Sequence, residues 1–565
     1  MNETNNEKGA STRFAARTSS HALLSVLIAN GVERAFLVPG ESYLGVLDAL
    51  NDFPQLDVVT CRHEAGAGFM ACADARLSGK PALAMVSRGP GASNASIAVH
   101  TAEQDALPVI LLIGQVPKDT LRWEAFQEID YQRMFGGIAK WVFEPTTPEQ
   151  LADAAFKAVR IATTGTPGPV VLVIPEDIQQ QDVNVPARGS EYVAAPHRPT
   201  LPAAEALAEV RGLIERAQRP LIIAGGQFEK PGGREALRAF AEAWQIPVAV
   251  SFRRHDCFPN NHPLYAGDLG LSNATHQMQA FHDSDLILAL GTRLGDITTQ
   301  GYSFPKLPQP AQTLVHVHPD DHTVGLHFAA NPGVVCDPVA LTQVLLPAAP
   351  RAADAARAQW LERLRSIREG IARWPALTPP AEGVHFTEVV RAVAERAPDN
   401  AIVCLDAGTF AAPVYRHFPF VYPQRLMSPL AGAMGYGTPA AIAAALRCPA
   451  AKVICMVGDG GFLMTGNEMI AAVERKLPVL FIVSDNGCYG SIRIHQEVHY
   501  PGRHAGTSLF NPDFARIAEA FGVEALRVRS HDEIAGAIAH GMGAAHPVLL
   551  HVATNLGTVL PRRAA

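Results

Sequence analysis

Two apolar runs in the last quarter of the chain each end in a residue that could bind a divalent cation. The run Val453–Val457 leads into Gly458-Asp459-Gly460, and the run Val479–Val483 leads to Asn486, 27 residues after Asp459. A helix-like segment between them indicates a strand–helix–strand unit, whose parallel strands have neighbouring carboxyl ends. A carboxylate and an amide oxygen at one such edge are the hard ligands that Mg²⁺ prefers.

The glycines beside Asp459 suggest that this edge also holds an anion. Gly458 and Gly460 let backbone N–H groups approach a phosphate, and a helix start adds positive dipole. We expect that helix over Asn467–Lys476. A Gly-Asp-Gly triplet by itself is more often a plain turn after a strand, so the second ligand at this spacing favours a Mg²⁺-diphosphate site.

The composition is that of an ordinary globular protein with several domains. At 565 residues the chain is too long for one core, and three domains fit well. Hydrophobic residues make up 48% and charged residues 18%. The formal net charge of -7 argues against nucleic acid as a partner, and no apolar stretch is long enough to indicate a membrane partner.

The cysteines and the N-terminus bear on the compartment. Eight cysteines are scattered without a C-x-x-C pair, mostly in apolar runs, as in proteins of a reducing cytosol, so we expect a cytoplasmic protein. Met1–Thr12 is polar and lacks the apolar core of a secretory signal.

Strand-like and helix-like stretches alternate from about Phe14 to the end, which predicts α/β architecture with doubly wound parallel sheets. Two proline-rich breaks, Asp182–Pro202 and Pro347–Gly383, divide the chain into three blocks, and a helix over Gln359–Arg373 is expected inside the second break. The expected division is a disordered tail 1–12, a first domain 13–185, a middle domain 198–347 and a third domain 380–560.

Several elements can be predicted within these blocks. The first block should hold a helix at Ser19–Asn30 and strands at Arg34–Val38 and Gly168–Pro175. The middle block has strands at Pro220–Ala224 and Asp285–Leu290, each running into a glycine turn, which is Rossmann-like patterning. The third block carries the metal site.

Several motifs together resemble the thiamine diphosphate enzyme family. The unit from Gly458-Asp459-Gly460 to Asn486 resembles the family's diphosphate–metal motif. In the first block, Arg62–Ala67 resembles the segment with the catalytic glutamate, and Ser87–Asn94 resembles the glycine-rich loop that follows it. Ala433–Gly437 is similar to the cofactor-bending segment. The resemblance runs along nearly the whole chain in the order pyrimidine-binding, middle and pyrophosphate-binding domain.

The resemblance implies a role for each matching residue. Asp459, Asn486 and the backbone carbonyl of Cys488 are expected to bind Mg²⁺. Glu64 is expected to hydrogen-bond the aminopyrimidine ring, so that its imino nitrogen removes the proton from the reactive thiazolium carbon. Met434 should enforce the bent cofactor. The residues expected along the diphosphate are Gly408, Thr409, Gly458, Gly460 and Gly461.

The family also implies an assembly. Its glutamate and its metal site come from different subunits, so we expect a homodimer as the minimum, and a homotetramer is common. The substrate is expected to be a small molecule, a 2-oxo acid or an aldehyde or ketone.

Departures from relatives bear on the reaction. Gly114–Pro117 and Ala125–Glu128 resemble acetohydroxyacid synthase. Glu41, however, stands where that enzyme has glycine and decarboxylases have a proton-relaying aspartate. Glu41 could equally be a helix N-terminal carboxylate that favours the dipole. The candidates for handling substrate protons and carboxylate are Glu41, Ser87, Gln127 and His495.

Other departures disfavour particular relatives. Pyruvate decarboxylases have paired histidines where this chain has Gln115-Val116, and a glutamate where it has Ile492. The flavin-associated stretch of acetohydroxyacid synthase reads Arg293–Ile297 here and keeps only the arginine and one aspartate, so FAD is expected to be absent or vestigial. That enzyme's lysine and its loop tryptophan are replaced by Glu176 and His495.

We interpret the chain as an enzyme that depends on thiamine diphosphate and Mg²⁺ and that makes or breaks a carbon–carbon bond next to a carbonyl. It resembles acetolactate synthase, with decarboxylation of a 2-oxo acid, carboligation or both. One alternative is an enzyme like 2-hydroxyacyl-CoA lyase or oxalyl-CoA decarboxylase, in which Arg253, Arg254 and Arg293 would serve phosphates rather than being plain surface residues. A catalytically inactive binding protein is a second alternative.

Two further readings are disfavoured. A dinucleotide-dependent dehydrogenase would need a G-x-G-x-x-G followed by an acid, which the middle block lacks. The spacing of His495, His499 and His504 gives no tidy helical face with cysteine or carboxylate partners, so these histidines are expected in a solvated loop rather than in a metal cluster.

Overall fold

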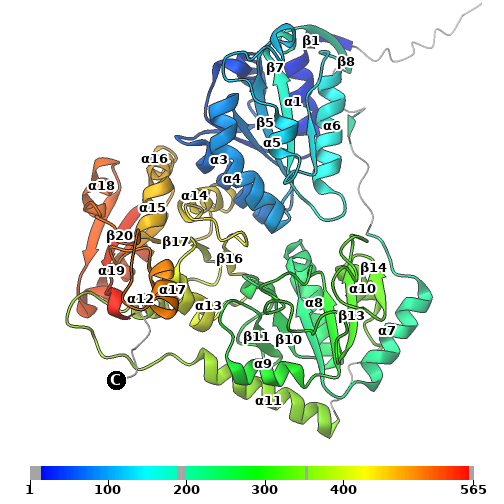
Figure 1. The fold of residues 1–565 in the computed structure, drawn as a ribbon, viewed down its shortest axis with the longest axis vertical. Coiled ribbons are helices and arrows are strands. Elements are labelled where there is room, and N and C mark those ends of the chain that lie inside the picture. Colours follow the sequence, from blue (N-terminus) through cyan, green and yellow to red (C-terminus); the bar gives the residue numbers. More distant parts are fainter. Residues whose placement is uncertain (1–13, 187–191, 194–198, 350–353, 559–565) are drawn as a thin grey trace, which may run out of the picture. The chain divides into compact units, whose positions relative to one another are not determined.

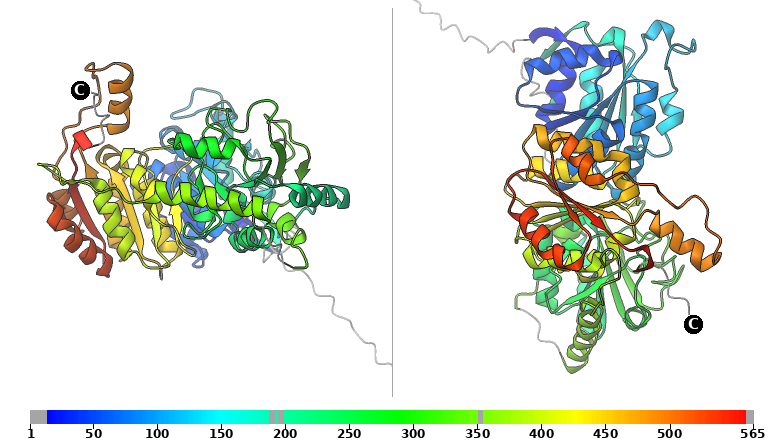
Figure 2. Two further views of the ribbon diagram at one scale, coloured as in Figure 1. Left: turned by 90° about the horizontal axis from the view of Figure 1, so that it is seen from below. Right: turned by 90° about the vertical axis from the view of Figure 1, so that its left-hand side faces the viewer.

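The protein was analysed as a computed structural model that describes residues 14–186, 192–193, 199–349 and 354–558. Three six-stranded sheets are present there, and every neighbouring pair of strands within them is parallel, as the alternating pattern predicts (Figure 1). Helices line both faces of these sheets (Figure 2). The contacts divide the chain into two units: residues 1–75 with 80–196, and residues 76–79 with 197–565. The expected tail 1–12 lies outside the described residues.

The first unit contains one parallel sheet of order β3-β2-β4-β5-β7-β6. Its strands are β2 (Arg34–Leu37), β3 (Asp57–Thr60), β4 (Ala82–Val86), β5 (Val109–Gln115), β6 (Trp141–Phe143) and β7 (Val170–Pro175). Its α-helices are α1 (Ser19–Ala29), α2 (Leu44–Ala49), α3 (Glu64–Ser78), α4 (Gly89–Asp105), α5 (Tyr131–Phe135) and α6 (Gln150–Thr163). Leu83 and Met85 of β4 pack with α1 and α6 in one core, whereas α3 and α4 lie on the opposite face (Figure 1).

An antiparallel ribbon in the first unit corrects one expectation. The segment from Asp182 was expected to be irregular, but β8 (Asp182–Pro186) pairs with β1 (Phe14–Thr18). The two partners are far apart in sequence, so no local pattern signals the pairing. Much of the rest of that expected break, 187–191 and 194–198, lies outside the described residues.

The second unit holds a sheet of order β11-β10-β9-β12-β13-β14 in its first part. Its strands are β9 (Pro220–Ala224), β10 (Val248–Val250), β11 (Tyr265–Asp268), β12 (Leu286–Leu290), β13 (Thr313–His318) and β14 (Gly333–Val335). Its helices are α7 (Ala204–Arg216), α8 (Gly233–Trp244), α9 (Thr275–His282), α10 (Pro338–Val344) and α11 (Ala355–Ala372). The last of these begins before the expected Gln359, because Asp354 caps it by accepting the backbone N–H of Arg357.

The other sheet of the second unit has the order β16-β15-β17-β18-β20-β19. Its strands are β15 (Ile402–Leu405), β16 (Arg425–Met427), β17 (Val453–Gly458), β18 (Leu480–Asp485), β19 (Glu524–Val528) and β20 (Val548–Ala553). Its α-helices are α12 (Phe386–Arg396), α13 (Ala412–His417), α14 (Gly437–Arg447), α15 (Asp459–Thr465), α16 (Met469–Glu474), α17 (Gly490–His499), α18 (Phe514–Ala520) and α19 (His531–Gly543).

The crossover between β17 and β18 differs from the expected single helix over Asn467–Lys476. A first helix, α15, begins at Asp459 itself, and a short 3-10 turn connects it to α16. Helical structure therefore starts directly at the end of β17, and it places the amides of the first turn beside the Asp459 carboxylate. Among the described residues, no helix combines the length and the apolar character that crossing a bilayer requires.

Candidate active site

The ends of β17 and β18 bring Asp459 and Asn486 together. The two strands are parallel neighbours, with Gly458 opposite Ser484. The Asp459 side chain is buried, and its carboxylate accepts backbone N–H groups from Gly460 at 2.8 Å, Asn486 at 3.3 Å and Cys488 at 3.2 Å. The convergence expected from the strand–helix–strand pattern is therefore present in the fold.

Two amide oxygens near this carboxylate are buried without a hydrogen-bond partner among the described residues, Oδ1 of Asn486 and Oδ1 of Asn511. Nδ2 of Asn511 donates to Asp459 at 2.8 Å and to Asp485 at 2.7 Å. Buried oxygens normally have a partner, and a carboxylate beside an unpartnered amide oxygen suits a hard divalent cation. The residues present therefore fit a magnesium ion.

The electrostatics of this edge favour a positive ligand. Burial raises the pKa of Asp459. Burial also disfavours ionised Asp485, but hydrogen bonds from His551 and Asn511 outweigh that effect and hold the pKa of Asp485 below its ordinary value. A bound cation would stabilise the ionised form of Asp459.

Several glycines allow the backbone to approach closely here. A Cβ on Gly460 would lie 2.4 Å from the ring of Tyr489, and one on Gly461 would lie 3.0 Å from the Asp406 carboxyl group. At Gly490 a Cβ would meet Thr409 Oγ1 and Asn486 Nδ2, each at 3.2 Å. Thr409 and Asn486, two of the expected ligand-binding residues, thus lie beside the same glycine.

Gly408 and Met434 belong to loops next to this edge. Gly408 follows β15, and an added Cβ there would contact the ring of Phe410. Met434 is half-buried and directly precedes Gly435, whose backbone N–H is bonded to Asp406.

In the first unit, Glu64 is the first residue of α3. Its Oε2 accepts from Nδ2 of Asn94 at 2.9 Å, and a Cβ on Gly91 would lie 3.4 Å from Oε1. Burial, and then the charge of Glu64, raise the pKa of Tyr43. The glycine-rich segment expected to be a loop is helical from Gly89, because Gly89 and Pro90 open α4.

Ser87, Gln127 and the turn before Glu41 surround the carboxyl ends of β2 and β4. A Cβ on Gly40 would lie 2.4 Å from Cβ of Ser87, and one on Gly89 would lie 2.5 Å from the backbone carbonyl oxygen of Gln127. Glu41 is exposed and is the first residue of a 3-10 turn. This position fits both the proton-relay and the helix-terminus readings of Glu41.

The histidine expectation needs correction. His495 and His499 lie on helix α17, one turn apart, with stacked rings 6.3 Å between centroids, while His504 pairs with Glu497. The i, i+4 spacing of the first two does form a helical face. No hydrogen bond or ring contact among the described residues joins His495 to the Asp459–Asn486 edge.

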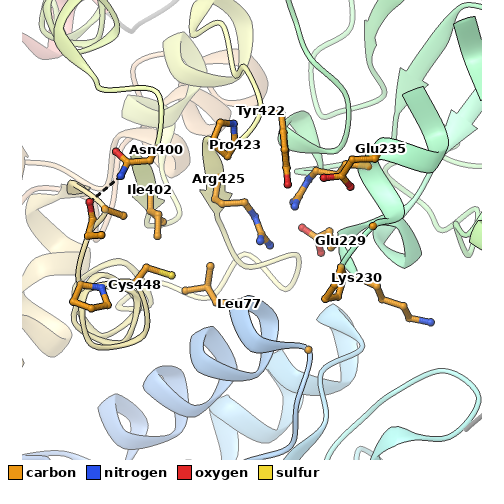
Figure 3. A pocket seen from close by; sticks show the side chains of 17 residues that line it. Leu77, Glu229, Lys230, Glu235, Asn400, Ile402, Tyr422, Pro423, Arg425 and Cys448 are labelled. Carbon is orange, nitrogen blue, oxygen red and sulfur yellow. Dashed lines mark hydrogen bonds between the residues drawn. The ribbon is translucent and has the colours of Figure 1, made fainter. Parts of the chain in front are cut away.

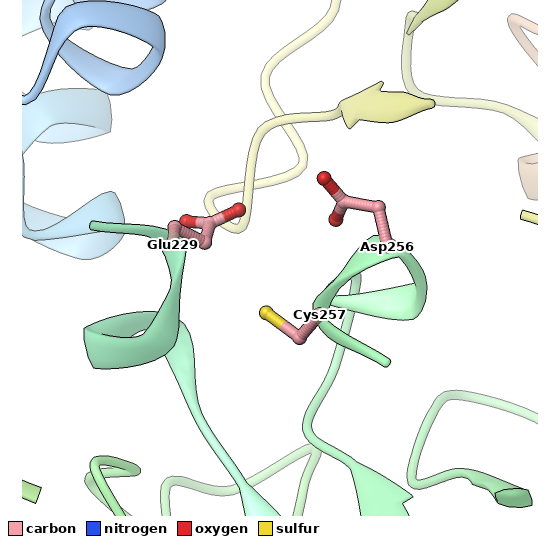
Figure 4. Close-up of side chains that lie close together, drawn as sticks. All are labelled: Glu229, Asp256 and Cys257. Atoms are coloured by element: carbon pink, nitrogen blue, oxygen red, sulfur yellow. The ribbon is translucent and has the colours of Figure 1, made fainter. Parts of the chain in front are cut away.

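A separate cluster of possible metal ligands lies in the second unit. Figure 4 shows Glu229, Asp256 and Cys257 close together. Guanidinium groups occupy this place: Arg234 lies 2.7 Å from Asp256, and Arg254 lies 3.4 Å from Glu229. Burial raises the pKa of Cys257 to about 12, so this thiol is neutral near pH 7 and a poor ligand.

Arginines of this region also correct an expectation. Arg253 and Arg254 are buried rather than plain surface residues, and Arg253 donates to the carbonyl of Pro429. A hollow of about 410 Å³ lies nearby in the second unit, with Arg234, Glu229 and Arg425 in its wall (Figure 3). Because these charges have both signs and Arg425 also reaches Asp256 at 3.1 Å, the wall does not concentrate one charge.

Sequence reasoning missed three polar residues at the predicted site. Asp406 directly follows β15, and this place at the carboxyl end of a parallel strand is a signal that could have revealed it. Asn94 lies inside the quoted Ser87–Asn94 motif. Asn511 lies in a loop before α18, and no pattern in the sequence points to it.

Oxygen ligands, glycine turns and helix starts at the carboxyl ends of parallel strands define an α/β enzyme class that binds an anionic cofactor. Residues 17–134, 207–345 and 406–552 match the N-terminal TPP binding domain, the central domain and the C-terminal TPP binding domain of thiamine pyrophosphate enzymes, respectively. The chain belongs to the thiamine pyrophosphate enzyme family and is a thiamine diphosphate-dependent enzyme.

Similar curated proteins cover nearly the whole chain. The acetolactate synthase large subunit of Parasynechococcus marenigrum is 32% identical over 95% of this chain and 87% of its own length. The acetolactate synthase isozyme 1 large subunit of Escherichia coli is 31% identical over 95% of this chain and 93% of its own length. The chain is therefore similar to acetolactate synthases along its full domain order.

Proposed function

We propose that this protein is a Mg²⁺-dependent carboligase of the acetolactate synthase type. It decarboxylates a 2-oxo acid and joins the remaining acyl unit to a second carbonyl compound. The observation that carries the proposal is the buried Asp459 carboxylate at the ends of adjacent parallel strands, beside the Asn486 amide oxygen, which has no hydrogen-bond partner in the described part of the chain.

The residues divide the work of holding and activating the cofactor. Asp459, Asn486 and the carbonyl of Cys488 hold Mg²⁺, and Thr409 with the neighbouring glycines holds the diphosphate. Glu64 accepts a hydrogen bond from the aminopyrimidine ring, and Met434 supports the bent shape. When bound, thiamine diphosphate supplies a nucleophilic carbon and an electron sink.

The substrate side of the site is proposed for residues of the first unit. Ser87 and Gln127 lie around the carboxyl ends of β2 and β4, where substrates of open α/β sheets bind. Glu41 supplies or removes a proton at the reacting carbon. His495 remains a candidate for the substrate carboxylate, because it stands where acetohydroxyacid synthase has the tryptophan of its active-site loop.

A complete site is proposed to need two copies of the chain. Large apolar side chains are exposed beside each group of site residues: Trp123 and Phe126 near Gln127, and Leu463, Met464 and Phe510 near Asp459 and Asn511. Clusters of this kind are typical of protein interfaces. We therefore propose a homodimer as the minimum, with a homotetramer as the expected assembly.

Two further parts of the proposal concern the flavin and the compartment. We propose no role for FAD, because Arg293–Ile297 departs from the flavin-associated stretch. The eight cysteines are scattered, mostly in apolar runs and without a C-x-x-C pair, which supports a reducing, cytoplasmic location. A flavin absorbance band in the purified protein would contradict the proposal that FAD has no role.

Calorimetry of the purified protein with thiamine diphosphate tests the proposal, with and without Mg²⁺. Binding that requires Mg²⁺, followed by CO₂ release and a carboligation product from a 2-oxo acid, is the expected result. Retention of the cofactor without any CO₂ from a panel of 2-oxo acids would leave a binding protein instead. Failure to bind would overturn the whole assignment.

A further inference from the structure

Asp406 is a fully buried carboxylate at the end of β15, and its partners are backbone amides. Gly435 N–H lies 3.0 and 2.9 Å from its two oxygens, and Gly437 N–H lies 3.1 Å from Oδ2. Ala407 N–H donates to Oδ1 at 2.6 Å. The carboxylate therefore ties the loop that carries Met434 to the end of a central strand.

The same carboxylate touches two further parts of the site. A Cβ on Gly461, in the first turn of α15, would lie 3.0 Å from it, and one on Gly437, the first residue of α14, would lie 3.1 Å from its Cβ. Asp406 thus contacts the diphosphate-side turn and the Met434 loop at once. It also lies at the N-terminus of an 11-residue helix, where a negative charge is favoured.

The loop is held from its other side by Thr465. Its hydroxyl donates to the carbonyl of Gly435 at 2.6 Å, while Asp406 accepts the N–H of the same residue. Gly435 has φ +85°, which a residue with a side chain rarely adopts. The residue directly after Met434 is therefore fixed on both of its backbone polar groups.

We propose that Asp406 is a positioning residue that sets where Met434 meets the cofactor, and that Thr465 completes this support. The inference rests on the proposed function, because it needs a cofactor above Met434. Burial raises the pKa of Asp406 to about 6, so it is mostly ionised at pH 7 despite the cost of burying a charge. Such a cost is typical of groups that preorganise a functional site.

The test compares Asp406→Asn with wild type in two separate measurements. Asparagine keeps the shape of the aspartate side chain. Its NH₂ group takes the place of Oδ2, however, and cannot accept the hydrogen bonds from the N–H groups of Gly435 and Gly437. Calorimetry gives the affinity for thiamine diphosphate with Mg²⁺, and NMR of quenched samples gives the hydrogen–deuterium exchange rate at the reactive carbon of the bound cofactor. We expect affinity within about threefold of wild type and exchange slowed by at least about tenfold, since small misplacements cost rate more than binding.

A double variant separates positioning from a general structural effect. If Asp406 acts through Met434, adding Asp406→Asn to Met434→Ala has no further effect. The exchange rate of the cofactor carbon in the double variant then stays within about twofold of the rate in Met434→Ala alone. The matched control is Asp337→Asn. The Asp337 carboxylate also accepts hydrogen bonds from backbone N–H groups, but at the start of α10, beside the other sheet of the same unit. The control should leave the exchange rate unchanged.

Each outcome supports or overturns either the proposed function or the positioning role of Asp406. Wild type that fails to bind the cofactor overturns the proposed function itself. If wild type binds the cofactor and Asp406→Asn shows the wild-type exchange rate, only the positioning role is overturned. A double variant in which the two effects on the exchange rate are fully additive also overturns only the positioning role. If Asp406→Asn does not fold, Thr465→Val takes its place: slowed exchange supports the inference, and an unchanged rate overturns it.

Discussion

Asn486 donates its backbone N–H to the Asp459 carboxylate across 3.3 Å, while its own side-chain Oδ1 is buried without a partner among the described residues. The two residues directly follow the neighbouring parallel strands β17 and β18, which are joined through a pair of helices. This arrangement leaves an amide oxygen ready to bind a cation beside a carboxylate.

Replacing Asp459 by asparagine should abolish the Mg²⁺ dependence of cofactor binding. The variant removes the charge that balances the cation and keeps the size of the side chain. We expect the dissociation constant of thiamine diphosphate with Mg²⁺ to rise by at least about 100-fold, or about 2.7 kcal/mol. Titration calorimetry measures it, with Asp337→Asn as control. Unchanged affinity would remove Asp459 from the metal site.

Glu64→Gln should leave cofactor binding nearly intact and stop its activation. An amide cannot hold the proton that a carboxylate shares with the aminopyrimidine ring, and such proton transfers contribute about 10²–10⁴-fold. Turnover should therefore fall by at least about 100-fold, while the calorimetric affinity changes by only a few-fold. Glu149→Gln, an exposed glutamate beside α6, serves as control. Near-normal turnover would contradict the assignment.

Glu41→Gln distinguishes the two readings of this residue. If Glu41 relays protons, product release slows and the product ratio changes, while thermal stability stays close to wild type. If Glu41 only favours the helix dipole, stability falls by about 0.3–1 kcal/mol and the product ratio is unchanged. We expect the first result, measured by product chromatography together with thermal unfolding.

Asp406 should make stability depend on pH in a defined direction. Burial raises its pKa from 3.8 to about 6, so the folded protein binds a proton between these values that the unfolded chain releases. This group's contribution to stability is therefore full below about pH 4 and is lost as the pH rises through about 6. Raising the pH from 5 to 7 should cost wild type about 1.4 kcal/mol relative to Asp406→Asn.

Unfolding of the cofactor-free protein at both pH values measures this difference. Asp337→Asn is the control for general effects of pH, because the Asp337 side chain is partly exposed whereas Asp406 is fully buried. An equal pH dependence in wild type and Asp406→Asn would show that Asp406 does not titrate in this range.

Part of the site could be predicted because it depends on short-range patterns. Asp459 and Asn486 follow apolar runs that form buried parallel strands, and the carboxyl ends of such neighbours meet at one edge. Glu64 and Ser87 were proposed instead from the resemblance of their motifs to the family, and they lie shortly after β3 and β4. The strand boundaries were within about two residues, because buried strands of five or six apolar residues leave little choice of register.

Other features could not be read from local patterns. The crossover after Asp459 was expected to contain one later helix, but α15 begins at once, since the glycines there do not prevent helix formation in a packed site. His495 and His499 were expected in a loop and lie on α17. In both cases tertiary packing outweighs the weak helix propensity of the segment.

The amino-acid sequence alone determined the parallel α/β plan, the pairing of β17 with β18, and the residue types at their ends, because these follow from apolar periodicity and chain direction. Only the tertiary structure decided that Asn511, 52 residues after Asp459, bridges two carboxylates, that Asp406 holds the Met434 loop, and that β1 pairs with β8. These contacts depend on the paths of loops that return from far along the chain, and no local periodicity encodes such a path.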